Sequence, residues 1–286
     1  TRTRLACCIM CLSLIGCVYT PLKSSSGNYT NGMVVSAHPL ASKVGLEILK
    51  KGGNAIDASV AVQFALAVVY PNAGNIGGGG FLVYRSKSGE VDALDFREKA
   101  PSKATREMYL DATGTPITNK SLYGHLAAGV PGSVDGMAKA HQRYGKLKWS
   151  SLIQPAIDLA KNGFPITEQQ ASELNEHSQS LKKYNPSNTY LQKTSTWVKG
   201  DKLTQHDLAS TLEQIRDKGR DGFYTGRVAD LLADEMKSGD GLITKEDLAS
   251  YHSIWRTPIT ANYKNYRVIT MPPPSSGGIA LIQLLK

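Results

Sequence analysis

The residues best suited to chemistry in this sequence lie between Asn75 and Arg97. Four consecutive glycines at 77–80 lead into a predicted β-hairpin over 81–96, and Arg97 follows its second strand. Glycine lets the backbone approach a ligand closely, and a guanidinium donates paired hydrogen bonds to an anion. The pattern suggests a site where backbone and guanidinium meet an anionic ligand. On composition alone, a tight connection that binds no ligand is the favoured interpretation.

This glycine run differs from a nucleotide phosphate loop. No Gly-Lys-Ser or Gly-Lys-Thr follows it, and the next predicted element is a strand instead of a helix. Four glycines also forfeit backbone entropy and side-chain packing. The sequence therefore predicts that these residues adopt positive φ angles or lie against another part of the backbone.

Two predicted helices precede the glycine run and must position it. The first spans 38–51, with a proline near its start and Gly52-Gly53 as its stop. Asn54 caps the second, which spans 55–70 and ends before a proline. This second helix is almost wholly apolar and too short for a membrane span, so we predict that it is buried in the core.

Beyond the hairpin the pattern is mostly helical and returns to strands near the end. Helices are predicted over 134–144, 149–162, 168–183, 205–218, 222–237 and 279–285, and a second hairpin over 257–261 and 266–271. Helices that bracket strands without a regular βαβ rhythm predict an α+β fold or an αββα layering.

The first 32 residues are predicted to lie outside this fold. Residues 1–17 have the early positive charges and short apolar run of a secretory signal. The run closes on Leu14-Ile-Gly-Cys17, which resembles the bacterial lipobox and predicts a lipid anchor on Cys17. A plain signal peptide or anchor is the alternative. Residues 18–32 would be a polar tether, and we expect an exported protein of the bacterial periplasm or cell envelope.

Charge, cysteines and histidines exclude several function classes for the rest of the chain. The net charge is +9, but basic residues are interleaved with acidic ones and no nucleic-acid-binding signature is present, so we expect no nucleic-acid partner. All four cysteines lie in the first seventeen residues, which argues against a disulfide framework elsewhere. No two histidines stand at metal spacing, and the calcium-like stretch 239–247 places Met236 and Ser238 at ligand positions. No metal site is predicted.

Six motifs, in this order, resemble the large-subunit half of the γ-glutamyltranspeptidase family. They are His38-Pro-Leu-Ala-Ser, Gly52-Gly-Asn-Ala-Ile-Asp-Ala, Gly74-Asn-Ile-Gly-Gly-Gly-Gly-Phe, Asp95-Phe-Arg-Glu-Lys-Ala-Pro, Gly129-Val-Pro-Gly and Pro272-Pro-Pro-Ser-Ser-Gly-Gly. The resemblance covers residues 33–286, and six ordered motifs form a specific signal.

The resemblance implies an N-terminal-nucleophile hydrolase fold, with two β-sheets between helical layers. Members of this family are made as one precursor that cuts itself, so that a threonine becomes the first residue of the small subunit. The α-amine of that threonine can activate its hydroxyl. The γ-glutamyl group of glutathione or a related amide passes to the threonine and then to water, an amino acid or a peptide. No cofactor is implied.

Arg97 is the residue of this chain that the resemblance assigns to a site. It matches the family arginine that clamps the α-carboxylate of the γ-glutamyl group, a task suited to a planar, permanently charged fork. Asp95 and Glu98 flank it, and we predict either that they orient its side chain or that they are surface charges. The segment 75–80 is expected to shape the core beside the pocket.

The family's threonine nucleophile is expected beyond Lys286, so no catalytic residue is assigned within this chain. We therefore expect the αββα sandwich to be incomplete here, and the 286 residues to be a truncated part of a precursor that is inactive alone. The small subunit from the same precursor would be the partner that completes the site.

Alternative functions stay open on the same scaffold. Cephalosporin acylases and capsule-anchoring transpeptidases share the layout and act on other amides, although Asp95-Phe-Arg97 favours a γ-glutamyl substrate. A non-catalytic binding protein of the cell envelope is a further alternative.

Overall fold

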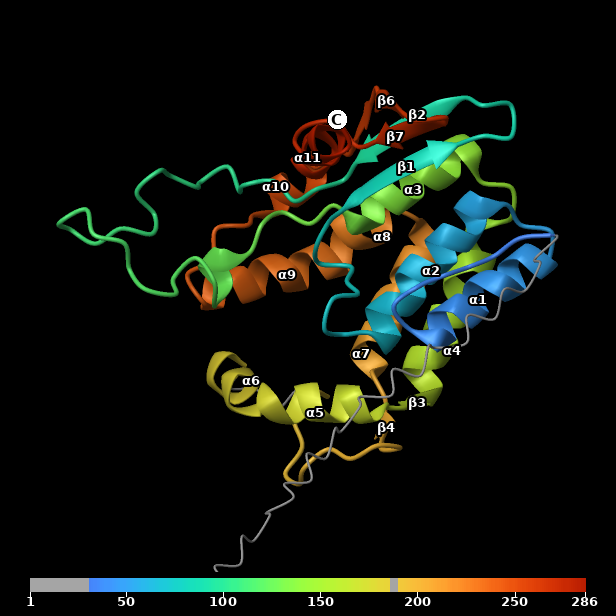
Figure 1. The fold of residues 1–286 in the computed structure, drawn as a ribbon. Coiled ribbons are helices and arrows are strands. Elements are labelled where there is room, and N and C mark those ends of the chain that lie inside the picture. Colours follow the sequence, from blue (N-terminus) through green and yellow to red (C-terminus); the bar gives the residue numbers. More distant parts are fainter. Residues whose placement is uncertain (1–30, 186–189) are drawn as a thin grey trace, which may run out of the picture. The chain divides into compact units, whose positions relative to one another are not determined.

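A computed structural model describes residues 31–185 and 190–286 (Figure 1). The predicted signal sequence with Cys17 and nearly all of the predicted tether lie outside these described residues. Residues from Val34 onward form one unit, to which the following description refers. Within the described part, no helix has both the length and the apolar character needed to cross a bilayer.

Helix α2 (Ala55–Val69) lies at the centre of the core, as its apolar sequence predicts. It packs against α1 (Pro39–Lys50), α3 (Ser133–Tyr144) and α4 (Trp149–Asn162). Because neighbours surround it, α2 carries apolar side chains on every face and not along a single stripe.

The N-terminus of α2 explains the motif that contains Asn54 and Asp57. Asn54 accepts hydrogen bonds from the amides at the start of the helix, and the Asp57 carboxylate accepts from the Asn54 amide, forming a capping box. Asp57 is fully buried and also accepts from the amides of Lys146 and Leu147. Its carboxylate therefore joins α2 to the loop after α3, and its role is structural.

The first predicted hairpin is present, and a third strand joins it. Strand β1 (Phe81–Arg85) pairs antiparallel with β2 (Val91–Asp95), and β2 pairs antiparallel with β5 (Ile254–Arg256). Helix α3 packs against β2 beneath the hairpin (Figure 1). Strand β5 was not predicted, because three residues show no clear period and its pairing partner lies far earlier in the chain.

The helix predicted over 168–183 is two helices in the structure. They are α5 (Glu168–Glu176) and α6 (Ser178–Tyr184). His177 separates them with φ −90° and ψ 2°, outside the helical region. A continuous amphipathic pattern did not reveal this break.

The helix predicted over 222–237 is also divided. Helix α8 (Asp221–Tyr224) is followed by α9 (Gly226–Ser238). Thr225 between them is extended, and Gly226 has a φ of +61°, which glycine adopts without steric cost. The chain changes direction here because of this glycine.

The C-terminal region follows the prediction closely. Strands β6 (Ile259–Tyr263) and β7 (Tyr266–Thr270) form the second hairpin, and α11 (Gly277–Leu284) follows. Helices combined with short antiparallel sheets confirm the α+β class. The remaining elements are η1 (His125–Ala127), β3 (Phe164–Pro165), β4 (Lys202–Leu203), α7 (His206–Lys218) and α10 (Lys245–Ser250).

Candidate functional site

Arg97 lies on the loop that leaves β2, and its backbone is held from two sides. Its amide donates to Asp95 Oδ1 at 3.1 Å, and its carbonyl accepts from the Tyr251 hydroxyl at 2.8 Å. The side chain is exposed, with one long contact of 3.5 Å from Nη1 to the Pro274 carbonyl. The backbone is thus fixed while the guanidinium faces solvent.

Asp95 has neither of its two predicted roles. Its side chain is nearly buried, and Oδ2 accepts from both Nε and Nη2 of Arg256 at 2.8 Å. This ion pair joins the neighbouring strands β2 and β5, so the carboxylate does not orient the Arg97 guanidinium. Across residues 31–185 and 190–286, no carboxylate lies within ion-pair distance of Arg97, and Glu98 forms no ion pair.

The glycine run packs against the Arg97 segment instead of cradling an anion. A Cβ on Gly79 would lie 2.5 Å from the Phe96 carbonyl oxygen and 2.8 Å from the Glu98 amide nitrogen. A Cβ on Gly80 would lie 2.9 Å from the Phe96 ring. No glycine at 77–80 has a positive φ. Of the two predicted reasons for the run, close backbone approach is the correct one.

Helix α3 closes the other side of this segment. The amides of Gly132 and Ser133 at its start donate to the Gly78 carbonyl at 2.7 and 3.0 Å. A Cβ on Gly132 would lie 2.1 Å from both the Phe96 carbonyl oxygen and the Tyr251 hydroxyl oxygen. Only glycine fits at that position, and three of the sequence motifs therefore meet where β2 ends.

The motif at 272–278, which follows the second hairpin, also lies beside Arg97. Pro274 contributes the carbonyl that contacts Arg97, and α11 begins three residues later. A Cβ on Gly278 would lie 2.1 Å from the Met271 carbonyl oxygen, so the helix starts directly against the end of β7. The structure thus places four separate motifs around one exposed arginine.

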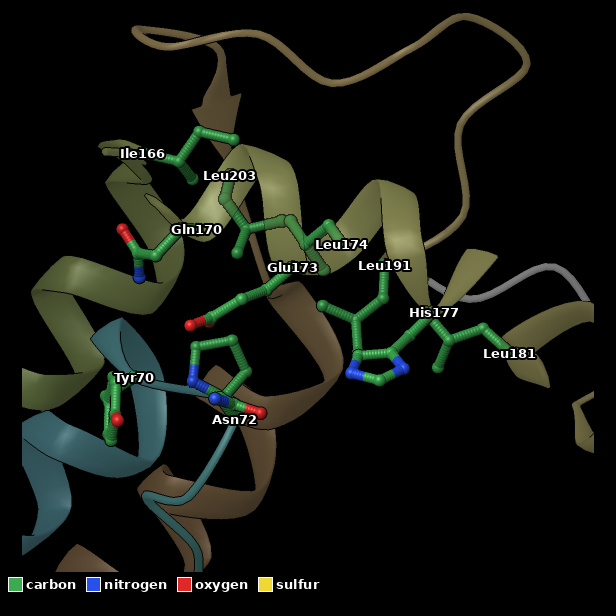
Figure 2. Close-up of a pocket in the computed structure, with 11 residues that line it drawn as sticks. Tyr70, Asn72, Ile166, Gln170, Glu173, Leu174, His177, Leu181, Leu191 and Leu203 are labelled. Atoms are coloured by element: carbon green, nitrogen blue, oxygen red, sulfur yellow. The ribbon is translucent and has the colours of Figure 1, made fainter. Parts of the chain in front are cut away.

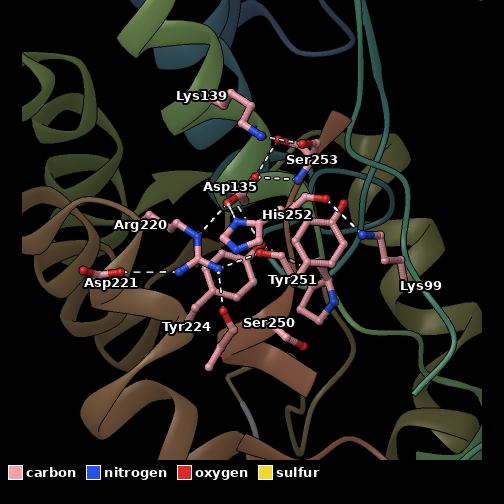
Figure 3. A network of polar contacts seen from close by, with 12 residues as sticks. Lys99, Asp135, Lys139, Arg220, Asp221, Tyr224, Ser250, Tyr251, His252 and Ser253 are labelled. Atoms are coloured by element: carbon pink, nitrogen blue, oxygen red, sulfur yellow. Dashed lines mark hydrogen bonds and ion pairs between the residues drawn. The ribbon is translucent and has the colours of Figure 1, made fainter. Parts of the chain in front are cut away.

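A buried polar network lies behind Tyr251 (Figure 3). Asp135 accepts from Arg220 Nε at 2.6 Å and from the amide and hydroxyl of Ser253 at 2.7 and 2.5 Å. Arg220 Nη2 donates to the carbonyls of Ala249 at 3.0 Å and Tyr251 at 2.6 Å. Burial alone would raise the pKa of Asp135, but the hydrogen bonds from Ser253 and the Arg220 charge hold it below its ordinary value.

A separate cavity lies between the end of α2 and helices α5 and α6 (Figure 2). It has a volume of about 210 Å³, and side chains such as Leu174, Leu191 and Leu203 make it mainly apolar. Its ionisable groups are the side chains of Tyr70, Glu173 and His177, and its lining includes no lysine or arginine. An anionic ligand therefore finds a better partner at Arg97 than in this cavity.

Tyr251 and Arg256 belong to the site and were missed from the sequence. Both follow α10 in a short stretch without apolar periodicity, outside the six motifs. Recognising β5 as a partner of β2 would have placed Arg256 near Asp95. Arg256 lies opposite Ala93 in the register of β2 and β5, which makes it a diagonal neighbour of Asp95.

Comparisons with known proteins agree with the arrangement of these motifs. The family model described as Gamma-glutamyltranspeptidase matches residues 41–286. The glutathione hydrolase proenzyme of Escherichia coli K12 is 47% identical over 270 residues, covering 94% of this chain and 46% of that protein. The chain thus spans about half the length of the curated relatives it matches.

Solved structures show the same similarity. Helicobacter pylori γ-glutamyltranspeptidase has a TM-score of 0.88 and 52% identity, covering 91% of this chain and 75% of that chain. A cephalosporin acylase from Bacillus halodurans has a TM-score of 0.74 and 30% identity, covering 87% of this chain and 49% of that chain.

Proposed function

Because this chain belongs to the γ-glutamyltranspeptidase family, we propose that its protein takes the γ-glutamyl group from glutathione or a related amide and passes it to water or an acceptor amine. The membership confirms the resemblance carried by the six motifs. The similarity to γ-glutamyltranspeptidase is stronger than that to the cephalosporin acylase, which supports a γ-glutamyl substrate over another amide.

The exposed guanidinium of Arg97 is the observation that carries the proposal. Its backbone is fixed by Asp95 and Tyr251, and no carboxylate of the described residues pairs with its side chain. A planar guanidinium on a backbone that is held in place suits bidentate binding of a carboxylate. We propose that Arg97 binds the α-carboxylate of the γ-glutamyl donor.

The nucleophile in this proposal is a threonine from sequence outside these 286 residues. The curated relatives are about twice as long as the matched region, and those from Escherichia coli and Bacillus subtilis are named proenzymes. The threonine hydroxyl attacks the γ-carbonyl and gives its proton to the threonine's own α-amine. That proton then passes to the departing amine, and water or an acceptor amine cleaves the resulting ester.

Replacing Arg97 tests the donor assignment in the full-length precursor after processing. With a γ-glutamyl anilide as donor, Arg97→Ala is expected to lower kcat/KM about a hundredfold, mainly through KM, because a charge-assisted contact of ~3 kcal/mol is lost. Arg97→Lys keeps the charge but loses the fork, so an intermediate value is expected. Arg85→Ala, an exposed arginine of the same hairpin, is the matched control.

An unchanged donor KM in Arg97→Ala would contradict the role of this arginine. Absence of turnover by the processed wild type would favour the envelope binding protein over the enzyme. The 286 residues alone are expected to give no turnover in the same assay. The predicted lipid on Cys17 and export to the envelope stay predictions, which mass spectrometry of the mature N-terminus tests.

A further inference from the structure

We propose that Tyr251 is a positioning residue for the donor site, because its hydroxyl holds the Arg97 carbonyl and so fixes where the guanidinium lies. The inference rests on the proposed function of Arg97. It adds a residue that lies outside the six motifs and that would not itself touch the donor.

The contact between Tyr251 and Arg97 is short and sterically enclosed. Tyr251 is 2% exposed, and its hydroxyl lies 2.8 Å from the Arg97 carbonyl oxygen. The absence of a side chain on Gly132 leaves the space in which this hydroxyl sits. Burial raises the pKa of the Tyr251 hydroxyl, so it remains a protonated donor at neutral pH.

Aromatic and cationic groups hold the Tyr251 ring in place. The rings of Tyr251 and Tyr224 are nearly parallel, with centroids 5.8 Å apart and 8° between their planes. Lys99 Nζ lies 4.9 Å from the Tyr251 centroid, and the Arg220 guanidinium carbon lies 4.6 Å from the Tyr224 centroid. Each of these contacts stabilises the same orientation of the ring, so together they restrict its rotation.

The backbone of Tyr251 is fixed as well. Its carbonyl accepts from Arg220 Nη2, and two residues later the Ser253 amide donates to the buried carboxylate of Asp135 (Figure 3). The position of Tyr251 is therefore set by contacts outside the loop that carries Arg97. The Tyr251 hydroxyl therefore keeps its position and, through its hydrogen bond to the Arg97 carbonyl, holds the loop that carries Arg97.

The substitution Tyr251→Phe in the processed full-length protein removes this hydroxyl and keeps the ring. We expect the donor KM to rise about tenfold with kcat changed less than about twofold, because one buried hydrogen bond that places the guanidinium is lost. In an Arg97→Ala background the same substitution should have little further effect on kcat/KM, since it acts through Arg97. Additive effects of the two substitutions would overturn the proposal.

Tyr224→Phe is the matched control. It keeps the ring that stacks on Tyr251 and loses only an equally buried hydroxyl. That hydroxyl donates to the Pro131 carbonyl at 2.7 Å, accepts from the Asp135 amide at 3.4 Å and makes no hydrogen bond to residues 95–99. We expect a similar loss of thermal stability with a donor KM within about twofold of wild type. An equal rise of KM in both variants would show general loosening and overturn a specific role for Tyr251.

Hydrogen exchange gives a readout that needs no turnover. Amides of residues 97–99 are expected to exchange about tenfold faster in Tyr251→Phe than in wild type or Tyr224→Phe. Unchanged exchange in Tyr251→Phe would overturn the positioning role. If the wild type fails to turn over, the proposed function is contradicted, and the exchange rates still decide whether Tyr251 holds this loop.

Discussion

Arg97 and Arg220 are both linked to Tyr251, and the structure uses the two arginines in opposite ways. The guanidinium of Arg220 is engaged within the protein by the buried Asp135 carboxylate and by the carbonyls of Ala249 and Tyr251. The guanidinium of Arg97 is exposed and makes one long contact to a carbonyl, while its backbone is held instead.

This difference separates an arginine that stabilises the fold from one that is available to a ligand. Each has an acidic residue close by in sequence, Asp221 after Arg220 and Asp95 before Arg97. Only the structure shows that Asp95 is paired with Arg256. Whether an arginine is available to a ligand therefore depends on whether protein groups already bind its guanidinium. The acidic residues next to it in the sequence do not decide this.

The largest expected effect is on stability at Arg220. Arg220→Ala leaves the Asp135 carboxylate buried without its cation, so we expect the free energy of unfolding to fall by about 4 kcal/mol. Urea denaturation measures this change. Arg216 is exposed to a similar degree, but its partner Asp217 is itself exposed, so Arg216→Ala should cost at most about 1 kcal/mol. Equal losses at both positions would remove the distinction between the two arginines.

A somewhat smaller effect is expected at Asp135, and it should depend on pH. Asp135→Asn is expected to cost about 3 kcal/mol near neutral pH, because Arg220 then loses its buried carboxylate and keeps only the exposed one of Asp221. The folded-state pKa of Asp135 is lowered, so its stabilising contribution is present above the ordinary carboxyl range and is lost as pH falls below about 4. Denaturation curves of both proteins should therefore converge in acid; a constant gap would contradict the assignment.

The smallest expected effect is at Asp95. Asp95→Asn keeps an oxygen that accepts from the Arg97 amide but loses the charge that binds Arg256. We expect a loss of about 2 kcal/mol in unfolding free energy, less than at Asp135 because Arg256 is a third exposed and stays solvated, and a donor KM within about threefold of wild type. A much larger rise in KM would mean that Asp95 orients the guanidinium after all.

Local elements of this fold were predictable because their signals are local. The apolar run of α2, its Asn54 cap and the turn chemistry of the first hairpin each act within a few residues. The breaks at His177 and Thr225 were not predicted, since the amphipathic pattern continues across both. A helix pattern fixes which face is apolar and says less about where the axis bends.

The candidate site was only partly predictable, for a related reason. Arg97 was assigned through its motif, and its role stays a prediction. Tyr251, Gly132 and Arg256 meet the Arg97 loop through contacts between segments far apart in the chain. Such contacts depend on strand order and helix placement, which no single stretch of sequence specifies.

Gly132 has a consequence for anyone who redesigns donor specificity. A mutant library restricted to Arg97 and its exposed neighbours would leave this residue unchanged, since a side chain there would point at Phe96 and Tyr251. Yet even alanine there would push apart the two groups that frame the arginine loop. Randomising position 132 together with 251 would let selection search alternative loop placements, which are inaccessible while either residue stays fixed.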